Sequence, residues 1–331
     1  MRGSVEYGRL GRFPATPGRT GGSTGISPWP SQHPRTSASL SAVEARVEGM
    51  AVSFSGVNEP TIRHSVTGHH PVPMRWYYPA GKDSEMTGVP TLVWAHGGGF
   101  FSGGLDQPEA HDVARALAQR GLPVVTVDYR LAPVPGLSWI RRGDMRPRGR
   151  FPLPVQDLLT AFRSVSSQSA GGVVLGGASA GACLAAAAAL QALDMGSAPT
   201  GVILAYGFFH SSHTASREIQ RRVRDHRRLT HSRLVLNAVN RNYAGTRAAL
   251  YDRYAFPGGH DLDGFPSTLM LNADRDAMRA SGDRFAAELL SAGADVEQHT
   301  LPGTRHAFLN RPRLDAFTTA VDLMAEWSLA R

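Results

Sequence analysis

The chain has 331 residues, of which 42% are hydrophobic, and its formal net charge is +8 at neutral pH. A single cysteine, Cys183, excludes an internal disulfide and is expected to pack in the core. No apolar run reaches the roughly 18 residues that a membrane span needs, and the N-terminus lacks the apolar stretch of a secretory signal, so we expect a cytoplasmic protein. Arginine supplies nearly all the positive charge in clusters without interleaved aromatic residues, which excludes a typical nucleic-acid platform.

The first 49 residues differ from the rest in composition. They are rich in Gly, Pro, Ser, Thr and Arg and show no apolar periodicity, so we expect residues 1–49 to be disordered or loosely draped. Two alternatives remain open: translation begins at Met50, or Trp29 or Leu40 folds back over the functional site as part of a lid. Residues 50–331 then form the folded domain.

Strands and helices alternate through most of that domain, which predicts an α/β fold with a doubly wound, mostly parallel sheet. An alternating pattern predicts an antiparallel strand over 72–78. Short apolar runs predict buried strands, and 3.6-residue periodicity predicts helices. The expected strands are 91–95, 122–127, 173–175, 202–206, 268–271 and 296–301, and the expected helices are 106–120, 154–165, 182–193, 280–292 and 314–329.

Residues 207–264 interrupt the alternation. A basic, helical stretch over about 216–239 is followed by a connection rich in Tyr and Gly. This insertion follows the carboxyl end of a predicted strand, and ligands bind beyond the carboxyl ends of the strands in such folds. We therefore expect the insertion to form a helical cap over the site. Residues 134–150 are rich in Pro, Gly and Arg and are expected to form a loop.

A candidate nucleophile stands between a predicted strand and a predicted helix. Residues 177–181, Gly-Ala-Ser-Ala-Gly, match the pattern G-x-S-x-G around Ser179. A serine at a sharp strand-to-helix turn needs neighbours without bulky side chains, and the helix that follows directs its N-terminal amides at the reaction centre. The alternative is that small residues only allow the helix to approach the sheet closely.

Later strands supply a base and an acid in the order that such a serine requires. His306 follows the last predicted strand, where we expect it to accept the proton of Ser179. His299 is a competitor, but it lies within that strand. Asp276 and Asp274 both follow the strand at 268–271, and either carboxylate could orient the histidine.

The oxyanion formed by such a nucleophile needs backbone N–H donors. Gly98 and Gly99 follow the strand at 91–95, and Ala180 follows the nucleophile, so these three residues are the candidate oxyanion hole. A glycine-rich phosphate loop is the alternative, but neither this loop nor the one at 176–181 continues into Gly-Lys-Ser/Thr.

Over residues 70–330 the chain resembles the bacterial hormone-sensitive-lipase-like carboxylesterases of the α/β-hydrolase superfamily. The matching motifs are His-Gly-Gly-Gly-Phe at 96–100, Asp-Tyr-Arg-Leu-Ala-Pro at 128–133, Gly-Ala-Ser-Ala-Gly at 177–181, Asp-Ala-Met-Arg at 276–279 and His-Ala-Phe at 306–308. The resemblance selects Asp276 as the acid and makes His96 structural. Val134 and Ala182 depart from the family pattern, in which glutamate and glycine are common.

The resemblance also implies a mobile cap, no metal or organic cofactor, and a small-molecule ester of short to medium acyl chain as substrate. We assign Phe100, Phe208 and Phe209 to substrate binding, and relatives that pair through sheet edges suggest a homodimer. The arginine-rich cap suggests an anionic ester. Two other functions remain open: acyl transfer in specialised metabolism, and non-catalytic binding of a small molecule, as in the plant gibberellin receptors that lack the catalytic histidine.

Overall fold

The computed structural model describes residues 59–67, 71–82, 88–135, 148–213, 216–223 and 231–331. The predictions for residues 1–49, and for most of the arginine-rich loop, therefore fall outside the described residues.

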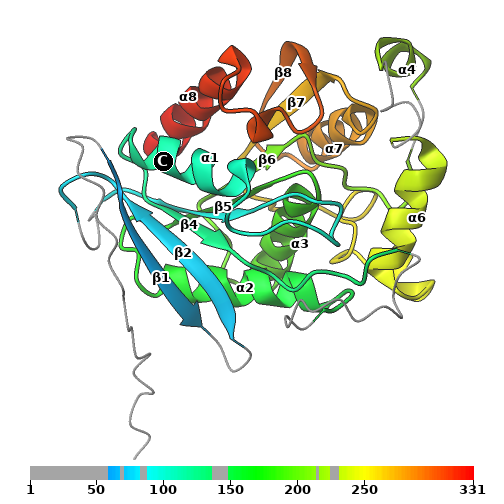
Figure 1. Cartoon of the computed structure of the whole chain (residues 1–331). Helices are drawn as coiled ribbons and strands as arrows, with labels where there is room; N and C mark the ends of the chain where they lie inside the picture. The colour runs from blue at the N-terminus through cyan, green and yellow to red at the C-terminus, as the bar shows by residue number, and fades with distance from the viewer. Residues whose placement is uncertain (1–58, 68–70, 83–87, 136–147, 214–215, 224–230) are drawn as a thin grey trace, which may run out of the picture. The chain divides into compact units, whose positions relative to one another are not determined.

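The described strands form one eight-stranded sheet in the order β1-β2-β4-β3-β5-β6-β7-β8 (Figure 1). Strands β1 and β2 are antiparallel to their neighbours, and the six strands from β4 to β8 pair in parallel. This sheet confirms the predicted fold class. The strands are β1 (Thr61–Thr67), β2 (Val72–Tyr78), β3 (Thr91–Ala95), β4 (Val124–Val127), β5 (Val173–Ala178), β6 (Gly201–Ala205), β7 (Thr268–Arg275) and β8 (Val296–Arg305).

Helices cover both faces of the sheet, which explains the continuous apolar runs in its strands. Along β3, Leu92 and Trp94 pack in one apolar cluster, whereas Val93 and Ala95 pack in the other. The first cluster includes side chains of α1 (Pro108–Ala118) and α8 (Asp315–Leu329). The second includes side chains of α2 (Leu153–Ser166), α3 (Ala180–Asp194) and α7 (Arg279–Ser291).

The helical stretch expected over 216–239 is not continuous. Helix α4 (Arg217–Arg222) is followed by Val223 with an extended backbone, and α6 (Arg233–Ala244) begins after Ser232. A β-branched residue with extended backbone ends the first helix. Helix α6 buries Leu236, Asn240 and Tyr243 on one side, and the short helix η1 (Ala248–Tyr251) follows it.

These segments all lie between β6 and β7 in the sequence, and α4 contacts β7. Another short helix, η2 (Phe308–Asn310), follows β8. Within the described part of the chain, no helix combines the length and the apolar character required to cross a membrane.

Candidate active site

Ser179 occupies a strained turn between β5 and α3. Its backbone has φ 53° and ψ −115°, a conformation that residues other than glycine rarely adopt, and its N–H donates to the carbonyl of Ala205 at 2.8 Å. A Cβ atom at Gly181 would lie 2.1 Å from the carbonyl oxygen of Ala95, and one at Gly177 would lie 2.4 Å from that of Gly181. Close backbone approach therefore explains both glycines of the G-x-S-x-G pattern.

Three side chains predicted from separate parts of the sequence meet at this turn. Ser179 Oγ lies 2.9 Å from Nε2 of His306, and Nδ1 of His306 lies 2.6 Å from Oδ2 of Asp276. All three residues are buried. Because a carboxylate can only accept here, the imidazole carries its proton on Nδ1 and leaves Nε2 free to accept the proton of the serine hydroxyl.

The two aspartates that follow the β7 pattern have different partners. Asp276 also accepts the N–H of Met278 at 3.0 Å. Burial opposes ionisation of Asp276, but the charge and hydrogen bond of His306 outweigh it and hold the pKa of Asp276 below its ordinary value. Asp274 instead contacts Arg222 of α4 and the N–H of Gly303. The geometry thus brings Asp276, and not Asp274, to the histidine.

The loop after β3 is arranged around its glycines. Gly98 and Gly99 have φ values of 122° and 60°, which glycine adopts without strain. The carbonyl of Gly98 accepts the N–H of Ser102 at 3.0 Å, so this carbonyl is directed toward the loop itself. Ala180 is the first residue of α3, where helix amides lack partners within the helix. The three candidate oxyanion donors thus lie in two backbone segments beside Ser179, the loop after β3 and the first turn of α3.

His96 is part of the scaffold of this loop. Its Nδ1 donates to the carbonyl of Gly97 at 2.7 Å, and its ring stacks on Tyr129 at 4.5 Å between centroids. The hydroxyl of Tyr129 donates to the carbonyl of His96 at 2.8 Å. The Asp-Tyr-Arg-Leu-Ala-Pro segment thus packs directly against the glycine-rich loop. His299, the competing histidine, contacts Glu297 on β8 and does not join Ser179.

Among the described residues, strained backbone conformations occur at strand ends near Ser179. The non-glycine residues with positive φ are Phe100, Ser179, Tyr206 and Ala307. They follow β3, β5, β6 and β8, and Ala307 stands next to His306. Such conformations persist only where the surrounding structure holds them, and they concentrate at functional sites.

The three phenylalanines assigned to substrate binding do not form one group. The rings of Phe100 and Phe208 make an edge contact at 5.5 Å. The ring of Phe209 instead stacks on Phe285 of α7 at 4.3 Å. Phe100 gains a partner that the sequence did not indicate, because Tyr243 of α6 stacks on it at 3.9 Å. Phe100, Phe208 and Tyr243 form one buried aromatic group.

Two histidines between β6 and α6 also face the triad. The ring of His231 lies 5.2 Å from that of His306, and His213 packs against Phe208 at the same separation. His213 is buried, and this desolvation lowers its pKa to about 4 despite the opposing charge of Asp276. No sequence signal separates these two residues from the other histidines of the chain.

Three described arginines of the basic segments bind other parts of the protein. Arg148 donates to the carbonyl oxygens of Phe101 and Ala132, both at 3.0 Å, and Arg150 donates to that of Asn242 at 2.9 Å. Arg222 binds Asp274. These three side chains hold loops and helices together, so they supply no support for an anionic substrate.

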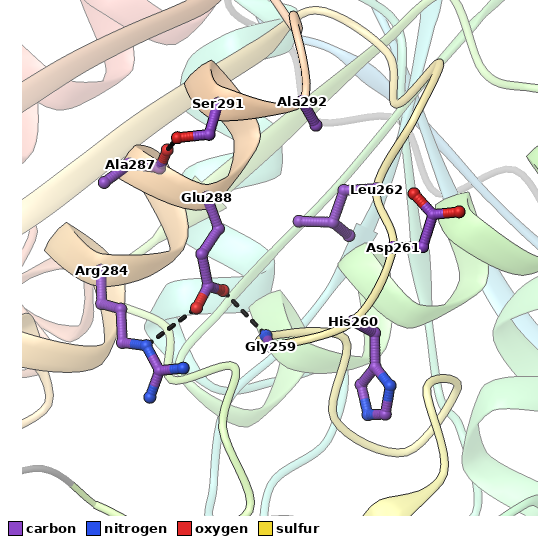
Figure 2. A pocket seen from close by; sticks show the side chains of 9 residues that line it. All are labelled: Gly259, His260, Asp261, Leu262, Arg284, Ala287, Glu288, Ser291 and Ala292. Atoms are coloured by element: carbon purple, nitrogen blue, oxygen red, sulfur yellow. Dashed lines mark hydrogen bonds and ion pairs between the residues drawn. The ribbon is translucent and has the colours of Figure 1, made fainter.

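A cavity of about 520 Å³ lies away from the triad, between α7 and the loop before β7 (Figure 2). Glu288 stands in it with partners of its own, Arg284 at 2.8 Å and the N–H of Gly259 at 2.9 Å. The lining includes no member of the triad or of the aromatic group. This cavity is therefore separate from the site around Ser179.

Comparison with known proteins identifies relatives of the whole described domain. A family model for the alpha/beta hydrolase fold matches residues 92–137 and 144–310. Carboxylesterase NlhH of Mycobacterium tuberculosis is 26% identical over 81% of this chain and 76% of its own. An ethyl acetate hydrolase of Pseudomonas putida is 30% identical over 72% of each chain. A solved esterase of Pyrobaculum calidifontis superposes with a TM-score of 0.69, at 27% identity, over 81% of this chain and 84% of its own.

Proposed function

Because the chain belongs to the alpha/beta hydrolase fold family, we propose that Ser179, His306 and Asp276 are the catalytic triad of a carboxylic-ester hydrolase. The observation that carries this proposal is the continuous chain of contacts from Asp276 through His306 to Ser179 Oγ. The ester-hydrolysing relatives support the reaction type.

The geometry supports a two-step reaction. His306 Nε2 accepts the hydroxyl proton as Ser179 Oγ attacks the ester carbonyl, and the N–H groups of Gly98, Gly99 and Ala180 stabilise the oxyanion. His306 then donates that proton to the departing alkoxide, which leaves an acyl-enzyme. Water, deprotonated by the same nitrogen, attacks the acyl carbon; the bond to Ser179 Oγ breaks, His306 returns the proton to Oγ, and the carboxylic acid leaves. Asp276 keeps the proton of His306 on Nδ1 and stabilises the imidazolium.

The segment 207–264 serves as the cap in this proposal. It supplies Phe208 and Tyr243, which pack on Phe100. Phe100 is the residue that directly follows the proposed oxyanion donors Gly98 and Gly99. Aromatic side chains at this point favour a compact apolar acyl group, and the ethyl acetate hydrolase among the relatives supports short to medium chains. The substrate is a small-molecule ester, and the assembled triad favours catalysis over the non-catalytic binding alternative.

Hydrolysis of p-nitrophenyl esters from acetate to decanoate tests the proposal, with wild type and Ser179→Ala measured in parallel. We expect wild type to hydrolyse the shorter esters and Ser179→Ala to fall to the rate without enzyme. A fluorophosphonate probe should label Ser179 in wild type only. An enzyme that neither reacts with the probe nor hydrolyses any ester would contradict the proposal.

We also propose a cytoplasmic homodimer without a nucleic-acid partner. Strand β8 lies at the edge of the sheet, where a second copy has access to unpaired backbone groups. Sedimentation of the full chain measures the oligomeric state. A disruptive proline substitution in β8 at the exposed Gln298 should yield monomers if this edge pairs.

A further inference from the structure

A buried carboxylate stands beside the triad and has no part in the mechanism above. Glu109, in the first turn of α1, is 2% exposed. Its backbone is held on both sides, because its N–H donates to Asn310 Oδ1 at 3.1 Å and its carbonyl accepts the indole N–H of Trp94 at 2.8 Å. A charged side chain is rarely fully buried unless it has partners, so its contacts indicate what it does.

The two carboxylate oxygens of Glu109 bind groups that belong to different halves of the site. Oε1 accepts the backbone N–H of Gly97 at 2.7 Å and the side-chain amide of Gln107 at 3.1 Å. Oε2 accepts the hydroxyl of Tyr206 at 2.6 Å. Each of these three partners is a donor, which suits an acceptor-only carboxylate at the N-terminus of a helix.

Gly97 connects this carboxylate to the oxyanion loop. It directly precedes Gly98 and Gly99, whose N–H groups are the proposed oxyanion donors. A Cβ atom at Gly97 would lie 2.3 Å from Glu109 Oε1 and 3.0 Å from Cβ of Ser179. The carboxylate, the loop backbone and the nucleophile are thus in direct succession, with no space between them for even one additional methyl group.

Tyr206 connects the same carboxylate to the catalytic histidine. Its ring meets that of His306 edge-on at 5.1 Å and that of Phe308 at 4.9 Å. Its backbone is strained, with φ 37°, and its N–H donates to the carbonyl of Leu271 at 2.7 Å. A tyrosine held in this conformation by its hydroxyl limits where the imidazole of His306 can move.

We propose that Glu109 is a positioning residue that holds the oxyanion donors and His306 in register through Gly97 and Tyr206. The inference rests on the proposed ester hydrolysis. The oxyanion forms between these two halves of the site, so a displacement of either half weakens stabilisation of the transition state more than binding of the ground state. Burial raises the pKa of Glu109, whereas the Tyr206 hydroxyl, the Gly97 amide and the charge of His306 oppose that shift.

The test compares Glu109→Ala with the near-isosteric Glu109→Gln on one short-chain ester. Loss of an oxyanion donor typically lowers kcat by about 100- to 1000-fold, so misplacement in Glu109→Ala should lower kcat by about 100-fold. KM should change by less than about threefold, because Glu109 does not contact the substrate in the ground state. Glu109→Gln keeps an acceptor for Gly97 and should recover kcat to within about tenfold of wild type.

A second readout reports the oxyanion directly. A trifluoromethyl ketone forms a tetrahedral oxyanion adduct with the serine, so its affinity should fall in Glu109→Ala by the same factor as kcat. Tyr206→Phe removes one hydroxyl and keeps the ring, and we expect about a tenfold loss of kcat. This variant tests the same link if Glu109→Ala does not fold.

Glu288→Gln is the matched control. This partly buried carboxylate on α7 binds Arg284 at 2.8 Å and the N–H of Gly259 at 2.9 Å in the cavity that is separate from Ser179, so its loss should lower Tm and leave kcat unchanged. Wild-type kcat in folded Glu109→Ala, or in Tyr206→Phe, would overturn the inference while leaving the triad intact. An inert, unlabelled wild type would instead overturn the proposed function.

Discussion

Arg222 of α4 binds the side chain of Asp274 at 2.7 Å, so the segment between β6 and β7 is attached to the sheet two residues before Asp276. The other carboxylate oxygen of Asp274 accepts the N–H of Gly303 in β8, at 3.2 Å. The charge of Arg222 and this amide overcome partial burial and lower the pKa of Asp274. One carboxylate therefore links α4, β7 and β8 at the margin of the site.

The variant Arg222→Ala should loosen α4. Exposed ion pairs are screened by salt, so the attachment should weaken at high ionic strength in wild type as well. We expect faster limited proteolysis of the segment 207–264 in the variant at low salt, and equal rates for both proteins at high salt. Arg217→Ala, which changes an exposed arginine of the same helix, should digest like wild type at both salt concentrations.

The variant Asp276→Asn should retain the fold and lose turnover. Asparagine can still accept the N–H of Met278, but it cannot hold the proton of His306 on Nδ1. Loss of the correct tautomer costs about 10⁴-fold in kcat in comparable triads. Steady-state kinetics measure the effect, and Asp274→Asn is the comparison, with kcat expected within a few-fold of wild type. A larger loss from Asp274→Asn than from Asp276→Asn would reverse our assignment of the acid.

The variant His213→Phe should make the protein less sensitive to acid. The pKa of His213 is lowered from 6.5 to about 4 in the folded state. As pH falls from 6.5 to 4, His213 therefore becomes protonated in the unfolded chain before it does so in the native state. The free energy of unfolding therefore decreases from pH 6.5 to 4, by about 3 kcal/mol for this group, and His213 has no such effect above pH 6.5.

Urea unfolding at pH 7 and pH 4.5 measures this difference. Phenylalanine keeps the aromatic contact with Phe208, and the variant should lose less stability than wild type between the two values. Equal losses in His213→Phe and wild type would show that His213 is not buried in neutral form.

The variants Tyr243→Phe and Tyr206→Phe should change stability in opposite directions. Tyr243 Oη is buried and has no hydrogen-bond partner among the described residues, whereas the hydroxyl of Tyr206 donates to Glu109. Removing an unsatisfied hydroxyl should stabilise the protein by about 1 kcal/mol, and removing a bonded one should destabilise it by about 1 kcal/mol or more. Chemical unfolding at pH 7 compares them. Destabilisation by Tyr243→Phe would indicate that its hydroxyl is bonded in solution.

Much of the sheet and the triad could be predicted because their signals are local. Strands such as β3 are buried on both faces and appear as short apolar runs, and each triad residue comes directly after a strand. Strand β1 was not predicted because it lies at the edge of the sheet, is partly exposed and has only two apolar residues, Ile62 and Val66. The extended backbone at Val223, which divides the basic helical stretch, also lacks a local signal.

Contacts between distant segments account for the rest. Glu109 and Tyr206 are 97 residues apart, and neither belongs to a pattern that indicates burial or function. Phe208 and Phe209 are adjacent in the sequence, but the packed structure directs their side chains to different neighbours. Phe209 therefore contacts α7 while Phe208 contacts Phe100. Such pairings depend on the packed structure and not on any one stretch of sequence.

The strained backbones at Phe100, Ser179, Tyr206 and Ala307 have a consequence for how this protein can adapt to heat. Glycine at any of them would relieve the strain, but it would also remove a side chain that packs beside the site after a strand end. Selection for thermal tolerance with retained turnover should therefore leave these four positions unchanged. Gains should accumulate in the helices that cover the sheet, where stability can rise without altering the chemistry.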